Sequence, residues 1–182
     1  MSEVSIVEDD PRPVVAELAD LLQARPFHQN QYDNLCRFMI YFSLAESKLT
    51  SMAAGLGGTD ALAQELVVHN GMDSQAIDDC YRYFIRRYRD SPDSDYRFNK
   101  LAPPEYVKNA IRGRFVTLLQ IQSPTIEDKI SFVFKVIFRL RHNLFHGEKW
   151  SYNLEDQEAN FSHANNVLLS CLTLTRGNMW HP

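Results

Sequence analysis

The sequence has no long uncharged apolar stretch. Crossing a bilayer takes roughly 18 to 20 consecutive apolar residues, and no run in the chain comes near that length. The first thirty residues also lack the basic flank and apolar centre of a secretory signal, and their beginning is acidic instead, with Glu3, Glu8, Asp9 and Asp10. We therefore expect a cytoplasmic protein with no membrane partner.

Cysteine is scarce as well. The three cysteines, Cys36, Cys80 and Cys171, are odd in number and far apart, and each lies within an apolar helical pattern. The chain has no Cys-x-x-Cys pair that would hold zinc. These features disfavour a disulfide framework and predict buried, reduced thiols.

Strand patterns are missing too, and apolar residues recur instead at steps of three and four. With 182 residues, of which 45% are hydrophobic, the chain is long enough for one domain with a sizeable core. We predict an all-α fold, an up-and-down bundle of about four long helices with one or two shorter ones. The expected organisation is a loose tail over 1–12 and a single helical domain over 13–182.

The apolar spacing also predicts where each helix lies. A surface loop is expected over 93–104, because two prolines and mixed charge interrupt the helical pattern there. Asn153 and Asp156 are expected to cap the last helix. The predicted apolar stripes run over 14–22, 35–52, 60–69, 77–88, 107–118, 126–144 and 161–175.

Basic residues are unevenly distributed in a chain whose net charge is −4. The segment 82–114 contains nine lysines or arginines and four acidic residues. The segment 129–149 contains five lysines or arginines and one acidic residue, Glu148. Such asymmetry is typical of a surface that binds a polyanion, although solvated basic faces explain it equally well. The candidate RNA-binding residues are Arg82, Arg86, Arg89, Lys108, Arg112 and Arg139.

The stretch RLRHNLFHGEKW, residues 139–150, gathers polar and basic groups at the end of the most regular predicted helix. Arg141 lies at the edge of a row of phenylalanines, where partial exclusion of water strengthens its attraction for a phosphate. His146 follows five positions later, about 140° around an unbroken helix. The two side chains converge only if the helix frays at Gly147 or if a second chain supplies its own pair across a two-fold axis.

The segment RHNLFHG, residues 141–147, resembles the RX4-6H signature of the HEPN superfamily. The surrounding helices are similar to the HEPN architecture over most of the chain. The resemblance implies a metal-independent endoribonuclease, often a toxin, a defence effector or an RNA-processing domain, that works as a homodimer without a cofactor. It implies Arg141 and His146 as the catalytic pair, with His142, Asn143 and Lys149 as supporting polar groups.

The implied reaction is attack of the RNA 2′-hydroxyl on the adjacent phosphorus, which leaves a 2′,3′-cyclic phosphate. Histidine exchanges protons near neutral pH, and arginine holds the phosphate and its developing charge. RNA is therefore the expected partner, with an antitoxin or regulatory protein as a further candidate. Some HEPN toxins have a tyrosine two residues after the histidine that their partner modifies, but this chain has Glu148 there.

Other interpretations of these residues stay open. Arg141 and His146 could serve only to cap the helix, since cations are favourable at its C-terminal end. His142 and His146 could bind a metal from one helical face, although Asn143 stands where a zinc protease has glutamate. Glu46 is either a partner of Arg141 or a surface residue. The bundle could also be an inactive HEPN-like module that binds RNA or a protein.

Overall fold

The described part of the chain folds into helices. The computed structural model describes residues 14–22, 28–68, 72–146 and 156–174. These residues contain no strand, so the all-α prediction is confirmed. In none of the described helices are length and apolarity sufficient to span a membrane. In chain order the elements are α1 (Val14–Leu22), α2 (Gln29–Lys48), the 3-10 helix η1 (Thr50–Gly58), α3 (Thr59–Val68), α4 (Ser74–Ile85), the π-helix η2 (Arg86–Asp90), α5 (Ser94–Leu101), α6 (Asn109–Gln120), α7 (Ile126–Phe145) and α8 (Glu158–Leu174).

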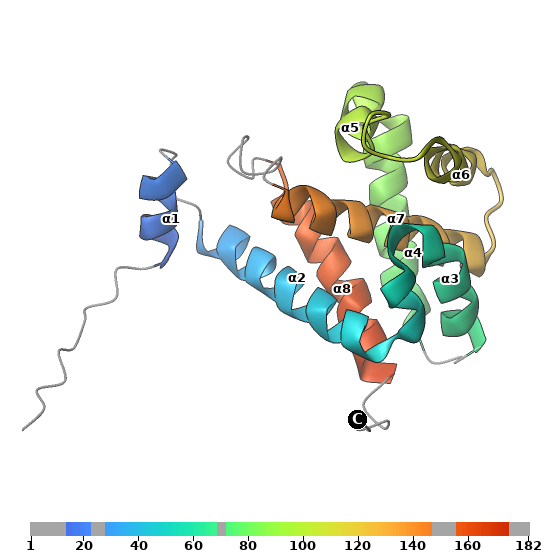
Figure 1. Cartoon of the computed structure of the whole chain (residues 1–182), viewed down its shortest axis with the longest axis horizontal. Helices are drawn as coiled ribbons and strands as arrows, with labels where there is room; N and C mark the ends of the chain where they lie inside the picture. The colour runs from blue at the N-terminus through green and yellow to red at the C-terminus, as the bar shows by residue number, and fades with distance from the viewer. Residues whose placement is uncertain (1–13, 23–27, 69–71, 147–155, 175–182) are drawn as a thin grey trace, which may run out of the picture.

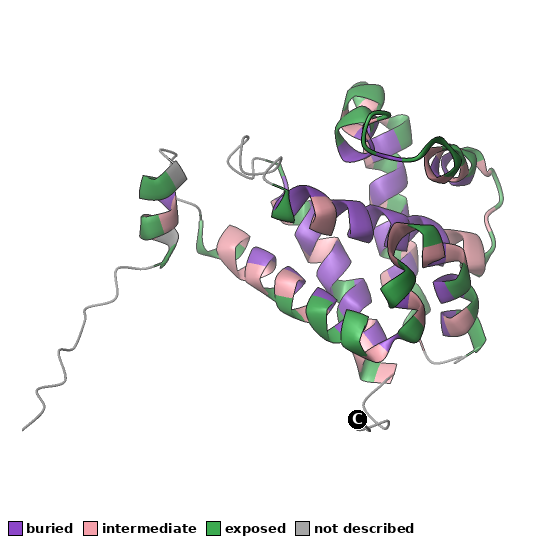
Figure 2. Cartoon of the chain, in the orientation of Figure 1, coloured by how far each residue is buried: buried purple, intermediate pink, exposed green. Residues whose placement is uncertain are grey.

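The central helix is α7 (Figures 1 and 2). Every residue from Ile130 to Leu140 is buried, because α3, α4, α5, α6 and η1 all pack on it. A capping box fixes its start: the Thr125 hydroxyl accepts the Asp128 N–H at 3.1 Å, and the Asp128 carboxylate accepts the Thr125 N–H at 3.1 Å. A helix buried on all sides holds its C-terminal residues in a defined place.

Helices α2 and α8 pack closely against each other beside α7 (Figure 1). The ring centroids of Phe38 on α2 and Phe161 on α8 are 4.9 Å apart. Phe42, one turn further along α2, meets Phe138 of α7 edge-on at 5.4 Å. Aromatic pairs of this kind contribute roughly 0.5–1.5 kcal/mol beyond their buried area. They place Phe42 beside the C-terminal half of α7.

The surface loop predicted over 93–104 is wrong, because α5 occupies Ser94–Leu101. Phe98 and Leu101 are buried, and the Leu101 carbonyl accepts a hydrogen bond from Arg139 of α7. A helix of this length is not stable by itself in water. Its stability therefore comes from tertiary contacts, which local composition does not reveal.

The helix that the apolar spacing predicts over 35–52 ends earlier in the structure. α2 stops at Lys48, and Leu49 is extended, with φ −103° and ψ 105°. In η1, which follows, Gly55 has φ 62° and ψ −149°, a conformation that is essentially restricted to glycine. Met52 is still buried. The spacing thus predicted which residues are buried, but not the path of the backbone.

The last helix also begins later than predicted. Asp156 has a left-handed φ of 57° and precedes the first residue of α8, so it does not lie in the first helical turn where a capping pair with Asn153 would place it. Its carboxylate binds Arg87 and Arg97 instead. Asn153, the other half of the predicted capping pair, lies outside the described residues, as does the tail over 1–12. The three cysteines are free; Cys80 and Cys171 are buried as predicted, and Cys36 is half-buried.

Candidate functional site

The motif residues end α7. The α-helix continues to Phe145, and His146 follows as the C-cap with φ −95° and ψ 15°. The N–H of His146 donates to the carbonyl of His142 at 3.0 Å, as in an unbroken helix. The chain does not fray before His146, so fraying does not bring Arg141 and His146 together in this conformation. Gly147 and Lys149 lie outside the described residues.

Arg141 lies at a pocket between α2, η1 and α7. Its guanidinium carbon is 5.6 Å from the ring centroid of Phe42 and 5.0 Å from that of Phe145. The pocket has a volume of about 170 Å³. A half-buried guanidinium on aromatic faces has fewer rotamers to lose and less water to displace when it binds an anion. The lining residues are Phe42 and Glu46 of α2, Gly55 and Leu56 of η1, and Phe138, Arg139, Arg141 and His142 of α7.

Two histidines connect this pocket to the end of α7. The ring of His142, which lines the pocket, lies against the ring of His146, with centroids 4.1 Å apart. Burial, together with the charges of Arg139, His146 and Arg141, lowers the pKa of His142 to about 4. His142 is therefore neutral at neutral pH and can accept a hydrogen bond. His146 is exposed.

Arg139 and Asn143 face the protein interior. Arg139 is only 2% exposed; its Nε donates to the Leu101 carbonyl at 2.8 Å and its Nη2 to Asn143 Oδ1 at 2.7 Å. The Asn143 amide donates to the carbonyls of Lys100 and Leu101 at 3.2 and 3.3 Å. The pair thus satisfies the last carbonyls of α5. Arg139 is therefore held under the end of α5, a helix that the sequence did not reveal, and it also lines the pocket beside Arg141. RNA binding by Arg139 stays a prediction.

The candidate RNA-binding residues outside α7 have different surroundings. Arg86 and Lys108 are exposed, whereas Arg82, Arg89 and Arg112 bind acceptors of the protein itself. The ion pairs of Arg82 and Arg89 lie on the surface and are therefore weak, so they do not prevent contact with a phosphate. RNA binding by these residues stays a prediction. The acceptors are Asp79 for Arg82, Asp90 and the Leu119 carbonyl for Arg89, and Asn99 and the Ala102 carbonyl for Arg112.

Glu46 and Phe42 are the residues that α2 adds to the site. Of the two predicted positions for Glu46, partner of Arg141 or surface residue, the structure shows an exposed residue. Glu46 also lines the same pocket as Arg141. Sequence reasoning missed Phe42, because its place in the apolar stripe of α2 only indicated a core position.

Within the described part of the chain, no group of three His, Cys, Asp or Glu residues is placed to hold a metal ion.

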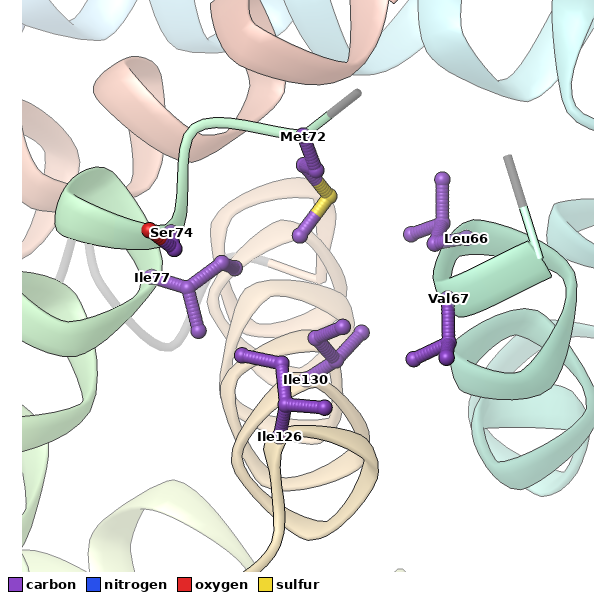
Figure 3. Close-up of a pocket in the computed structure, with 7 residues that line it drawn as sticks. All are labelled: Leu66, Val67, Met72, Ser74, Ile77, Ile126 and Ile130. Carbon is purple, nitrogen blue, oxygen red and sulfur yellow. The ribbon is translucent and has the colours of Figure 1, made fainter. Parts of the chain in front are cut away.

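A second pocket, of about 260 Å³, opens between α3, α4 and the start of α7 (Figure 3). Its described lining has six apolar side chains and the hydroxyl of Ser74, and none of them is ionisable. Such a lining offers no group to bind a phosphate or transfer a proton at neutral pH. The pocket at Arg141 is therefore the better candidate for chemistry. The apolar lining residues are Leu66, Val67, Met72, Ile77, Ile126 and Ile130.

Comparisons with protein-family models, curated proteins and solved structures found no match for this chain. A functional assignment therefore depends on the residues at the end of α7 and on the pocket that they border.

Proposed function

We propose that this protein is a metal-independent endoribonuclease that acts as a homodimer. The observation that carries the proposal is that Arg141 and His142 line one pocket at the end of α7 and that the ring of His146 lies against the ring of His142. The order of these residues, RHNLFH, resembles the HEPN signature and supplies the reaction class. The proposed setting is a toxin or defence effector.

Each residue has a distinct role in the proposed reaction. Arg141 binds the scissile phosphate and stabilises the charge that builds on it. His146 accepts the proton that leaves the 2′-hydroxyl and delivers a proton to the departing 5′-oxygen. The bond from the 2′-oxygen to phosphorus forms as the bond from phosphorus to the 5′-oxygen breaks. Neutral His142 packs against the ring of His146 in its own chain and fixes the orientation in which that ring is presented to the partner subunit.

A second chain completes the proposed site. Arg141 and His146 leave an unbroken helix in directions about 140° apart, so one copy does not bring them to a single phosphate. A two-fold axis near the end of α7 would bring His146 of the partner subunit to Arg141. Phe145, which is 60% exposed between them, offers an apolar contact for such an interface.

The decisive experiment is RNA cleavage in the presence of a metal chelator. The wild-type protein is expected to release fragments with 2′,3′-cyclic phosphate ends. The variants Arg141→Ala and His146→Ala are expected to lose this activity. Arg37→Ala, which removes an exposed arginine of α2 that does not line the pocket, serves as the matched control. Intact RNA after long incubation with folded wild-type dimer would overturn the proposal.

An inactive RNA-binding or partner-binding module is the second candidate function. It is favoured by the divergence of Arg141 and His146 within one chain, because a helix end can carry both residues without catalysis. This candidate predicts salt-sensitive RNA binding with no products.

The toxin setting has a test of its own. A toxin should inhibit growth when it is expressed alone, and co-expression of an antitoxin or regulatory protein should relieve the inhibition.

A further inference from the structure

The pocket beside Arg141 combines apolar walls with polar groups of both kinds. Phe42, Leu56 and Phe138 supply apolar surface from three different elements. The carboxylate of Glu46 comes from α2, and the groups of Arg141 and His142 come from α7. The proposed cleavage mechanism uses Arg141 and His146, but it gives no role to Glu46.

A nucleobase fits this combination of groups. A base has apolar faces that stack on aromatic or guanidinium groups, and a polar edge that is read by hydrogen bonds. Phe42 is buried, and the Arg141 guanidinium lies over its ring at the edge of the pocket, so the planar group offered to a base is the guanidinium. A phosphate bound by Arg141 would therefore have the base of its own nucleotide within reach of the pocket.

Glu46 decides which base would be preferred. A carboxylate only accepts hydrogen bonds, and it can accept two side by side. On its Watson–Crick edge guanine presents two adjacent donors, N1–H and the N2 amino group. Adenine, cytosine and uracil present an acceptor next to each donor, which would face a carboxylate oxygen unfavourably.

We propose that this pocket is a base-binding subsite in which Glu46 selects guanine. The base is that of the nucleotide whose 2′-hydroxyl attacks, so its position relative to the cleaved bond rests on the proposed ribonuclease function. Binding of guanine does not rest on it. A bidentate pair of this kind gives about ten- to hundredfold discrimination between bases.

Binding of the four nucleoside 3′-monophosphates to the full-length protein, measured by titration calorimetry, tests the subsite without requiring catalysis. Guanosine 3′-monophosphate is expected to bind about tenfold or more tightly than the adenosine, cytidine and uridine compounds. Glu46→Gln should remove this difference. Glu105→Gln, an exposed carboxylate that does not line the pocket, should retain it. Both sites are exposed, so circular dichroism should show folded variants.

Cleavage of a random-sequence RNA separates the two proposals. Guanosine in excess at the 3′ ends of wild-type products, but not of Glu46→Gln products, supports the subsite. Equal binding of the four monophosphates, or a guanine preference that Glu46→Gln leaves intact, overturns it. Guanine-selective binding that depends on Glu46, without any cleavage by the wild type, supports the subsite and overturns the ribonuclease assignment.

Discussion

The rings of His142 and His146 lie 4.1 Å apart, one turn from each other at the end of α7. Only His142 is turned toward the pocket, where burial and neighbouring positive groups lower its pKa to about 4. Two histidines of one motif therefore have different environments. The neutral ring of His142 provides a fixed surface for the ring of His146.

His142 should make folding less stable in mild acid. Its pKa is about 4 in the folded chain and about 6.5 when unfolded, so between these pH values the unfolded chain binds the additional proton. The group has no effect above pH 6.5, and its destabilising effect grows as pH falls toward 4. Because the ring is partly exposed, the loss in the free energy of unfolding is limited to roughly 1 kcal/mol.

Urea unfolding at pH 7 and at pH 4.5 checks this expectation. His142→Gln removes the titrating ring and should lose less stability over this interval than the wild type does. An NMR titration should show one histidine ring, absent from the spectrum of the variant, with a midpoint near 4. A midpoint near 6.5 for that ring would contradict the prediction.

Asn143 should contribute to stability rather than directly to chemistry. Asn143→Ala removes an acceptor from buried Arg139 and a donor from the carbonyls of Lys100 and Leu101. The expected loss in the free energy of unfolding is about 2–4 kcal/mol. Asn166→Ala, on the exposed face of α8, should change it by less than about 0.5 kcal/mol. Equal urea midpoints for Asn143→Ala and the wild type would contradict this stabilising role of Asn143.

The glycines of η1 should respond differently to substitution by alanine. Gly55→Ala meets no steric obstacle, but a φ of 62° strains an alanine by roughly 1–3 kcal/mol. Gly58→Ala should also destabilise the fold, because the added Cβ would collide with the Cβ of Ala54. Gly57→Ala makes only an ordinary 3.9 Å contact with Ile111 and is the matched control. Thermal unfolding should give lower midpoints for Gly55→Ala and Gly58→Ala than for Gly57→Ala. Equal midpoints for Gly55→Ala and Gly57→Ala would contradict the prediction.

A site shared between two chains predicts recovery of activity by mixing. Arg141→Ala retains His146, and His146→Ala retains Arg141, so their heterodimer contains one complete site out of two. Random exchange makes half of the dimers heterodimers, and RNA cleavage should return to about a quarter of the wild-type rate. Each variant incubated with itself is the control. No recovery after subunit exchange, confirmed by light scattering and mass spectrometry, would place both residues of a site in one chain.

Much of the helical fold could be predicted from the spacing of apolar residues. The stripe over 126–144 predicted α7, because a helix buried by its neighbours repeats apolar side chains every three or four positions. The stripe over 77–88 predicted the helical segment that the structure divides into α4 and η2. The same spacing failed at η1, where Met52 keeps its burial although the backbone leaves the α-helix.

The sequence by itself determined where the polar motif lies, since periodicity placed 139–146 at the end of a long amphipathic helix. Only the tertiary structure decided which motif residues face inward and which border the pocket. Arg139 and Asn143 turn inward because α5, some forty residues earlier in the chain, presents the carbonyls of its last turn to them. Arg141 and His142 border a pocket whose other walls come from α2 and η1. Contacts between residues so distant in sequence leave no local pattern from which they can be predicted.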